Sequence, residues 1–154
     1  MRLSFPRLVT ALLAALTVVS CASSFELSPN EEAQLKEAMD TPLSFVVPRG
    51  QSISTWDRAQ EFIDRYSSMK LRSVNDSLIT SYENTPMVTN PIQSASNVRF
   101  GYTVSRANDP EGIRFHVQCT ASGKSGETDA DKNAHIAAYY IKTGTVACDR
   151  CIVR

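Results

Sequence analysis

The clearest helical period in the chain lies between Thr55 and Ser67. The apolar residues of this stretch recur at helical spacing and share one face of an α-helix; they are Trp56, Ala59, Phe62, Ile63 and Tyr66. Burial of each large side chain contributes about 1.5–3 kcal/mol. The pattern predicts the main core helix, and it favours a core role for Trp56 over a ligand-binding role.

A period of two appears twice in the second half of the chain, on either side of the turn at residues 108–112. The apolar positions are Val98, Phe100, Tyr102 and Val104 before the turn, and Ile113, Phe115, Val117 and Cys119 after it. This alternation predicts an antiparallel β-hairpin with one apolar and one wet face. The polar positions form the wet face, where we expect a partner to bind: Arg99, Thr103, Arg114, His116 and Gln118.

The remaining elements have weaker patterns. Ser28, Pro29 and Glu31 form a capping-box signature at the start of a short helix. Residues 43–47 lie between prolines and predict an edge strand or an extended packing segment. The other predicted segments are the helix 29–39, strands 71–74 and 78–82, a long loop at 83–97, a Gly/Ser loop at 121–127, a helix at 129–142, and a short strand or extended tail at 145–153.

This order predicts one α+β domain over residues 28–154. We expect an antiparallel sheet of about four strands with two helices packed on one face.

The N-terminus has the pattern of an export signal over residues 1–20. Arg2 and Arg7 give a basic start, and residues 8–19 form an apolar run. This run is shorter than the roughly 20 residues that a membrane-spanning helix needs. We therefore expect the segment to be removed after export.

Val18-Val19-Ser20-Cys21 resembles the lipobox of bacterial lipoproteins. The resemblance implies cleavage before Cys21, attachment of diacylglycerol and palmitate-type acyl chains to Cys21, and a lipidated tether at 21–27. Ala22 in place of Asp implies, in Gram-negative lipoproteins, sorting to the outer membrane, facing the periplasm. The alternative is an ordinary secretory signal that is cleaved after Ala22 and releases a secreted protein.

The architecture is also similar to the helix-grip domains of some envelope lipoproteins, including accessories of outer-membrane assembly. No sequence motif accompanies this similarity, and a shared architecture does not by itself transfer a function.

Charge argues against nucleic acid as a partner. The whole chain has 16 basic and 16 acidic residues, and removal of residues 1–20 takes away Arg2 and Arg7, which leaves 14 − 16, or about −2. Binding to phosphate backbones requires a basic excess on one face. The partners that we expect are the lipid bilayer, through acylated Cys21, and an envelope protein.

Three cysteines lie in the folded part: Cys119, Cys148 and Cys151. In an oxidising compartment we favour a structural disulfide from Cys119 to one cysteine of the tail, which would leave the third cysteine unpaired within the chain. Redox catalysis by the C-x-x-C at 148–151 is disfavoured because no helix can follow it. A zinc site with His116 and the three cysteines is disfavoured because positions 116 and 119 face opposite sides of a strand.

No catalytic set can be recognised. Ser122-Gly123-Lys124-Ser125 lacks the first glycine of a phosphate-binding loop, because position 118 is Gln118. We expect no catalytic residues, no metal and no cofactor, and an anchored domain for protein interaction or assembly support. The alternative is a secreted or periplasmic module that binds a small apolar ligand behind Phe100, Tyr102 and Phe115.

Overall fold

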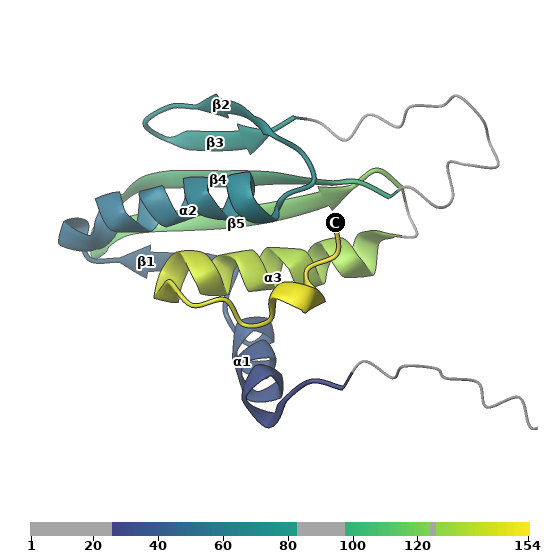
Figure 1. Cartoon of the computed structure of the whole chain (residues 1–154). Helices are drawn as coiled ribbons and strands as arrows, with labels where there is room; N and C mark the ends of the chain where they lie inside the picture. Colours follow the sequence, from purple (N-terminus) through teal and green to yellow (C-terminus); the bar gives the residue numbers. More distant parts are fainter. Residues whose placement is uncertain (1–25, 83–97, 124–125) are drawn as a thin grey trace, which may run out of the picture.

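The computed structural model describes residues 26–82, 98–123 and 126–154, and within them it shows an α+β fold (Figure 1). The sheet is antiparallel throughout, in the order β1-β5-β4-β3-β2. Its strands are β1 (Ser44–Val47), β2 (Leu71–Val74), β3 (Leu78–Ser81), β4 (Phe100–Asp109) and β5 (Gly112–Ala121). The predicted fold class is confirmed.

Helices α2 (Ser52–Tyr66) and α3 (Glu127–Thr143) lie side by side against the sheet, and α1 (Pro29–Met39) packs on α3 (Figure 1). The described residues thus form five strands and three helices, where we predicted about four and two. The additions have a simple origin. Residues 44–47 pair with β5 as a true edge strand, and the short capped helix at the N-terminus adds a third helix to the same side.

The periodic helix behaves as its sequence predicts. It begins at Ser52, after the one-turn 3-10 helix η1 (Arg49–Gln51), and its buried side includes all five apolar residues of the pattern. Trp56 is buried, with its ring centroid 6.0 Å from that of Phe115. The core role of Trp56 is confirmed.

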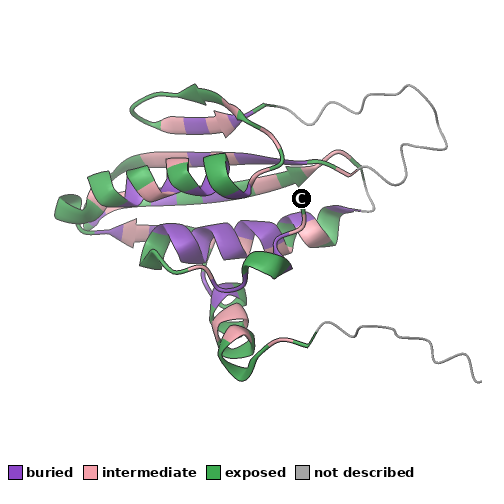
Figure 2. Ribbon diagram, in the orientation of Figure 1, coloured by how far each residue is buried: buried purple, intermediate pink, exposed green. Residues whose placement is uncertain are grey.

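The hairpin β4–β5 forms the centre of the sheet. Its register runs without interruption from Phe100 opposite Ala121 to Asp109 opposite Gly112. The apolar face of the hairpin packs under the helices, and buried residues run through α3 and the middle strands (Figure 2). Ten residues on each arm make this pair longer than β1, β2 or β3.

The C-terminal segment is extended, with one short 3-10 helix, η3 (Asp149–Cys151), and contains no strand. Asn133 of α3 is fully buried and bonds both main-chain groups of Val153: its Nδ2 donates to the carbonyl at 2.8 Å, and its Oδ1 accepts from the N–H at 3.0 Å. The tail is therefore part of the folded domain.

Three predictions fall outside the described residues: the export signal, the attachment of lipid at Cys21, and the loop at 83–97. Within the ranges that the structure describes, no helix combines the length and the apolar character needed to cross a bilayer.

Candidate functional site

The sheet face opposite the helices is the candidate functional site, and we call it the open face. On the central hairpin, Thr103 pairs with Gln118, and Ser105 pairs with His116. Alternate residues of a strand point to the same side of a sheet, so these side chains share the face that the helices leave uncovered. Arg114, His116 and Gln118 are exposed, and Thr103 is half-buried.

Arg99 extends this surface past the beginning of β4. It lies one residue before the strand, is exposed, and its backbone N–H donates to Oγ of Ser122 at 3.0 Å. Because it continues the alternation of Thr103, the structure brings all five predicted residues to one side of the sheet. Their predicted role in binding a partner stays a prediction.

Arg114 is held in place by Asp109 at the hairpin turn. Its Nε and Nη2 both donate to Oδ2 of Asp109, at 2.9 and 2.6 Å. The backbone N–H of Glu111 bonds the other carboxylate oxygen at 3.0 Å. These two contacts, the Glu111 N–H first and Arg114 second, lower the pKa of Asp109 below its ordinary value. The open face thus carries an arginine whose orientation is set before any partner arrives.

The expected disulfide from Cys119 to the tail is wrong. Cys148 and Cys151 bond each other, and Cys119 is a free thiol. The physical reason is local: the η3 turn brings the two tail cysteines to a Cα–Cα distance of 5.2 Å, whereas Cys119 lies on β5 beside Ala130 and Ala134 of α3. A loop this small contributes about 2 kcal/mol, the low end of the range for a disulfide.

The disfavoured alternatives for the cysteines are not assembled either. His116 is exposed on the open face, while Cys119 lies on the helix side of the same strand. Within the described part of the chain, no group of three His, Cys, Asp or Glu residues is placed to hold a metal ion. The disulfide Cys148–Cys151 is buried, and in the described part of the chain Cys148 precedes the three-residue η3 and not an α-helix.

The half-buried environment of Cys119 disfavours its thiolate form. Burial raises the pKa of its thiol to about 12, so the thiol is protonated at neutral pH. The Tyr102 hydroxyl beside it is also buried, and burial raises its pKa well above the ordinary value. Interaction with the Cys119 thiol adds to this rise in pKa, although among the described residues no partner of the hydroxyl has the distance and angle of a hydrogen bond.

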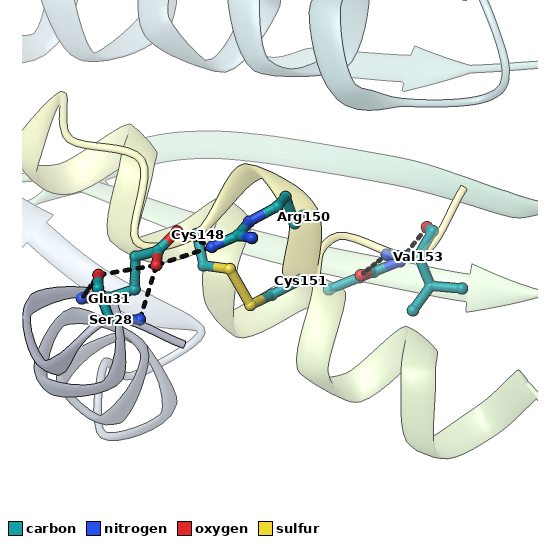
Figure 3. Close-up of a disulfide and its surroundings, with 7 residues drawn as sticks. Ser28, Glu31, Cys148, Arg150, Cys151 and Val153 are labelled. Atoms are coloured by element: carbon teal, nitrogen blue, oxygen red, sulfur yellow. Dashed lines mark hydrogen bonds and ion pairs between the residues drawn. A yellow bond between two sulfur atoms is a disulfide. The ribbon is translucent and has the colours of Figure 1, made fainter. Parts of the chain in front are cut away.

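A second cluster of interactions joins the C-terminal tail to the start of α1 (Figure 3). The Glu31 carboxylate accepts bonds from the backbone N–H and the hydroxyl of Ser28, and it pairs with Arg150 at 2.9 Å. The Ser28 N–H first and Arg150 second lower the pKa of Glu31 from 4.5 to about 2. The capping box was predicted from its sequence signature, but the pairing with Arg150 was missed because no local pattern links positions 31 and 150.

Sequence reasoning also missed a groove beside β5, which we call the edge groove. Its volume is about 450 Å³. One side is formed by Leu43 and residues 118–121, and the other by Glu127, Ala130, Asp131 and Ala134 of α3. The predicted lengths of the segments already indicated this groove. A strand of residues 43–47 is shorter than the hairpin arm beside it, so it cannot pair with the whole arm.

The space behind the hairpin, where a small apolar ligand was the alternative, holds aromatic side chains of α2. The ring centroid of Phe62 lies 5.6 Å from that of Tyr102, and the ring centroid of Trp56 lies 6.0 Å from that of Phe115. The described core gives the ligand-binding alternative no separate support.

Comparison with known proteins gives no relative. No family model, no curated protein and no solved structure matches this chain.

Proposed function

We propose that this protein is an envelope lipoprotein, anchored in the outer membrane through acylated Cys21 and facing the periplasm. Its domain binds another envelope protein, or supports an assembly of envelope proteins, and carries out no catalysis. The observation that supports this function best is the open face, a sheet surface that none of the described helices covers, with exposed polar side chains above a well-packed core.

The chemistry of the open face suits a protein partner. Arg114 presents a guanidinium that Asp109 already holds at 2.6 Å, so binding costs less side-chain entropy than it would for a freely rotating arginine. His116 and Gln118 add hydrogen-bonding groups on the same strand, and Thr103 adds a hydroxyl on its neighbour. Such a surface is compatible with an interface between separately folded proteins, because these interfaces are about as polar as the rest of a protein surface.

With the lipid anchor, a low affinity of the domain for its partner protein is enough for the two to associate. Diacylglycerol and a further acyl chain meet the requirement of two hydrophobic attachments for stable membrane residence. A partner in the same membrane is then met at a high effective concentration, which strengthens a modest interface without new contacts.

The anchor is tested by the intact mass of the protein extracted from its native membrane, beside a Cys21→Ala variant. The expected wild-type mass is that of residues 21–154 plus diacylglycerol and acyl groups, and this addition is lost in the variant. A lipid-free chain that begins at Ser23 would contradict the anchor and indicate a secreted protein.

The interaction is tested by placing a photo-crosslinking amino acid at position 116 on the open face in the native membrane. The matched control carries the same group at Asp64, an exposed position on α2. We expect one discrete cross-linked protein from position 116 and none from position 64. Equal labelling from both positions, or none from either, would count against an interface on the open face.

A further inference from the structure

Strand β5 has an edge that β1 covers only in part. The β1 register runs from Ser44 opposite His116 to Val47 opposite Ile113. One more bond extends it, from the Val117 N–H to the Leu43 carbonyl at 2.8 Å. Beyond Leu43 comes Pro42, which has no N–H, and the chain turns toward α3. The four residues of β5 at 118–121 therefore extend past the last residue of β1 that pairs with it.

The backbone N–H groups of this stretch alternate in direction along the strand. Those of Cys119 and Ala121 point away from β4. The Val117 N–H points away from β4, because it bonds Leu43. The N–H groups of Cys119 and Ala121 lie two and four residues further along β5. They point in the same direction, because the direction of the N–H alternates from residue to residue in an antiparallel strand. The hydrogen bond of Tyr102 supports this orientation. Tyr102 lies opposite Cys119 on β4, and its N–H donates to the Ser81 hydroxyl on the side away from β5. In the described part of the chain, no β1 residue pairs with Cys119 or Ala121.

The outward main-chain groups open into the edge groove. Its far wall is α3, where the small, buried side chains of Ala130 and Ala134 line the groove. Glu127 and Asp131 flank these alanines at the rim and are exposed. Both charged side chains that line the groove are therefore acidic.

We infer that the edge groove binds an extended, basic segment of a partner protein, which pairs with Cys119 and Ala121 as an added strand beside β5. The side chains of this strand that point toward α3 include Lys or Arg, whose apolar stems lie against Ala130 and Ala134 and whose charged ends meet Glu127 and Asp131. Addition of a strand to an exposed sheet edge is a known mode of peptide recognition: main-chain hydrogen bonds supply affinity, and the neighbouring wall supplies selectivity. This inference rests on the proposed function and specifies one class of partner for it.

A second copy of this chain fits the groove less well. Self-pairing through residues 118–121 would bring the acidic rims of two copies together and repel them. The part of β5 beyond the end of β1 is also only about 13 Å long at roughly 3.3 Å per residue, which is short for the interface of a stable dimer. A basic strand of four or five residues matches both its length and its charge.

The test is the binding of a labelled eight-residue peptide of alternating Lys and Val to the full chain, measured by fluorescence anisotropy. Two comparison peptides replace Lys by Glu, which reverses the charge, or Val by Pro, which prevents strand pairing. We expect the Lys–Val peptide to bind at least ten-fold more tightly than either. Hydrogen exchange should slow at the amides of Cys119 and Ala121 when it binds.

A charge-reversal pair locates the site. Glu127→Lys combined with Asp131→Lys should weaken binding of the Lys–Val peptide at least ten-fold. The matched control, Asp57→Lys combined with Asp64→Lys, makes the same change at exposed positions of α2 and should leave the affinity within two-fold. Circular dichroism of both variants checks that the fold is kept.

The other outcomes each overturn the inference in a distinguishable way. Slowed exchange at residues 114–118 in place of 119 and 121 would move the peptide to the open face, which overturns the edge groove and keeps the proposed function. Concentration-dependent dimerisation that protects Cys119 and Ala121 would make a second copy the occupant. Equal affinity for all three peptides, or no binding, would overturn the strand-addition model, while the cross-link at position 116 tests the proposed function separately.

Discussion

Glu31 shows how one carboxylate connects two distant parts of the chain. It closes the capping box with Ser28 at the start of α1 and pairs with Arg150 of the tail at 2.9 Å. Its pKa is lowered from 4.5 to about 2. Because the folded-state pKa lies below the unfolded value, the stabilisation is fully present above pH 4.5 and is lost as the pH falls toward 2.

We therefore expect Glu31→Gln to lower the urea midpoint of unfolding at pH 7, with the difference from wild type shrinking between pH 4.5 and 2. Equilibrium unfolding across that range measures it. In a double-mutant cycle, Glu31→Gln combined with Arg150→Gln should cost less than the sum of the single changes. A difference of constant size down to pH 2 would show that the charge of Glu31 plays no part.

Gly112 marks the point where β5 meets the end of β1. A Cβ built at Gly112 would fall against the backbone carbonyl of Val47, with a side-chain carbon of Val46 at 3.2 Å. A backbone carbonyl in a paired strand cannot rotate away, so the strands must shift. Gly112→Ala should lower the free energy of unfolding by about 1–3 kcal/mol, measured by denaturant titration.

The matched control for this change is Gly50→Ala, where a Cβ meets nothing within 4 Å. This substitution should be neutral, or stabilising by up to about 1 kcal/mol, because it only restricts the unfolded chain. Equal destabilisation at both glycines would contradict the steric explanation.

At the scale of elements, Arg58 joins α2 to the end of α3. Its Nε donates to the Ile141 carbonyl at 2.9 Å, and its Nη2 donates to the Lys142 carbonyl at 3.3 Å. The last carbonyls of a helix have no partner within the helix, and a cation there also opposes the partial negative charge of the helix end. Gly144, in the left-handed region at φ 81°, completes the termination of α3.

Arg58→Met keeps most of the aliphatic stem and removes the donors. It should lower the free energy of unfolding by about 1.5 kcal/mol, at the lower end for bonds from a charged donor, because Arg58 is half-exposed. The control, Arg65→Met, removes an exposed cation from the same helix at 3.9 Å from Glu61 and should cost about 0.5 kcal/mol or less. Equal costs would indicate that Arg58 acts through general charge alone.

At the scale of the whole molecule, the tail closes the domain through Asn133. The side chain is fully buried and bonds the N–H and the carbonyl of Val153. Asn133→Ala leaves both main-chain groups without these partners and should lower the free energy of unfolding by about 2 kcal/mol. Hydrogen exchange should become faster over the C-terminal residues, which is the sharper measurement.

The control for this change is Asn30→Ala, at an exposed position of α1, which should stay within about 0.5 kcal/mol of wild type. Exchange in the tail that is unchanged in the Asn133 variant would show that other contacts hold the segment, such as the buried side chain of Ile152 and the pairing of Arg150 with Glu31. The tail contacts therefore decide whether residues 145–154 belong to the cooperative unit.

Local patterns in the sequence determined the elements of this protein. The stripe through Trp56 and Phe62 predicts α2 because only one helix face can be buried. The alternation of Phe100, Tyr102 and Val104 predicts β4 because successive side chains of a strand point to opposite sides. The same alternation separates the open face from the core, so the candidate surface follows from periodicity.

Only the tertiary structure decided which distant segments meet. The ion pair of Glu31 with Arg150, the bonds of Asn133 with Val153, and the end of the β1 pairing before Cys119 all depend on where the chain turns between elements. Turns are set by a few contacts that leave no periodic trace in the sequence. Periodicity in the sequence indicates whether a side chain faces the core or water. Which distant residues contact each other depends on the path of the whole chain.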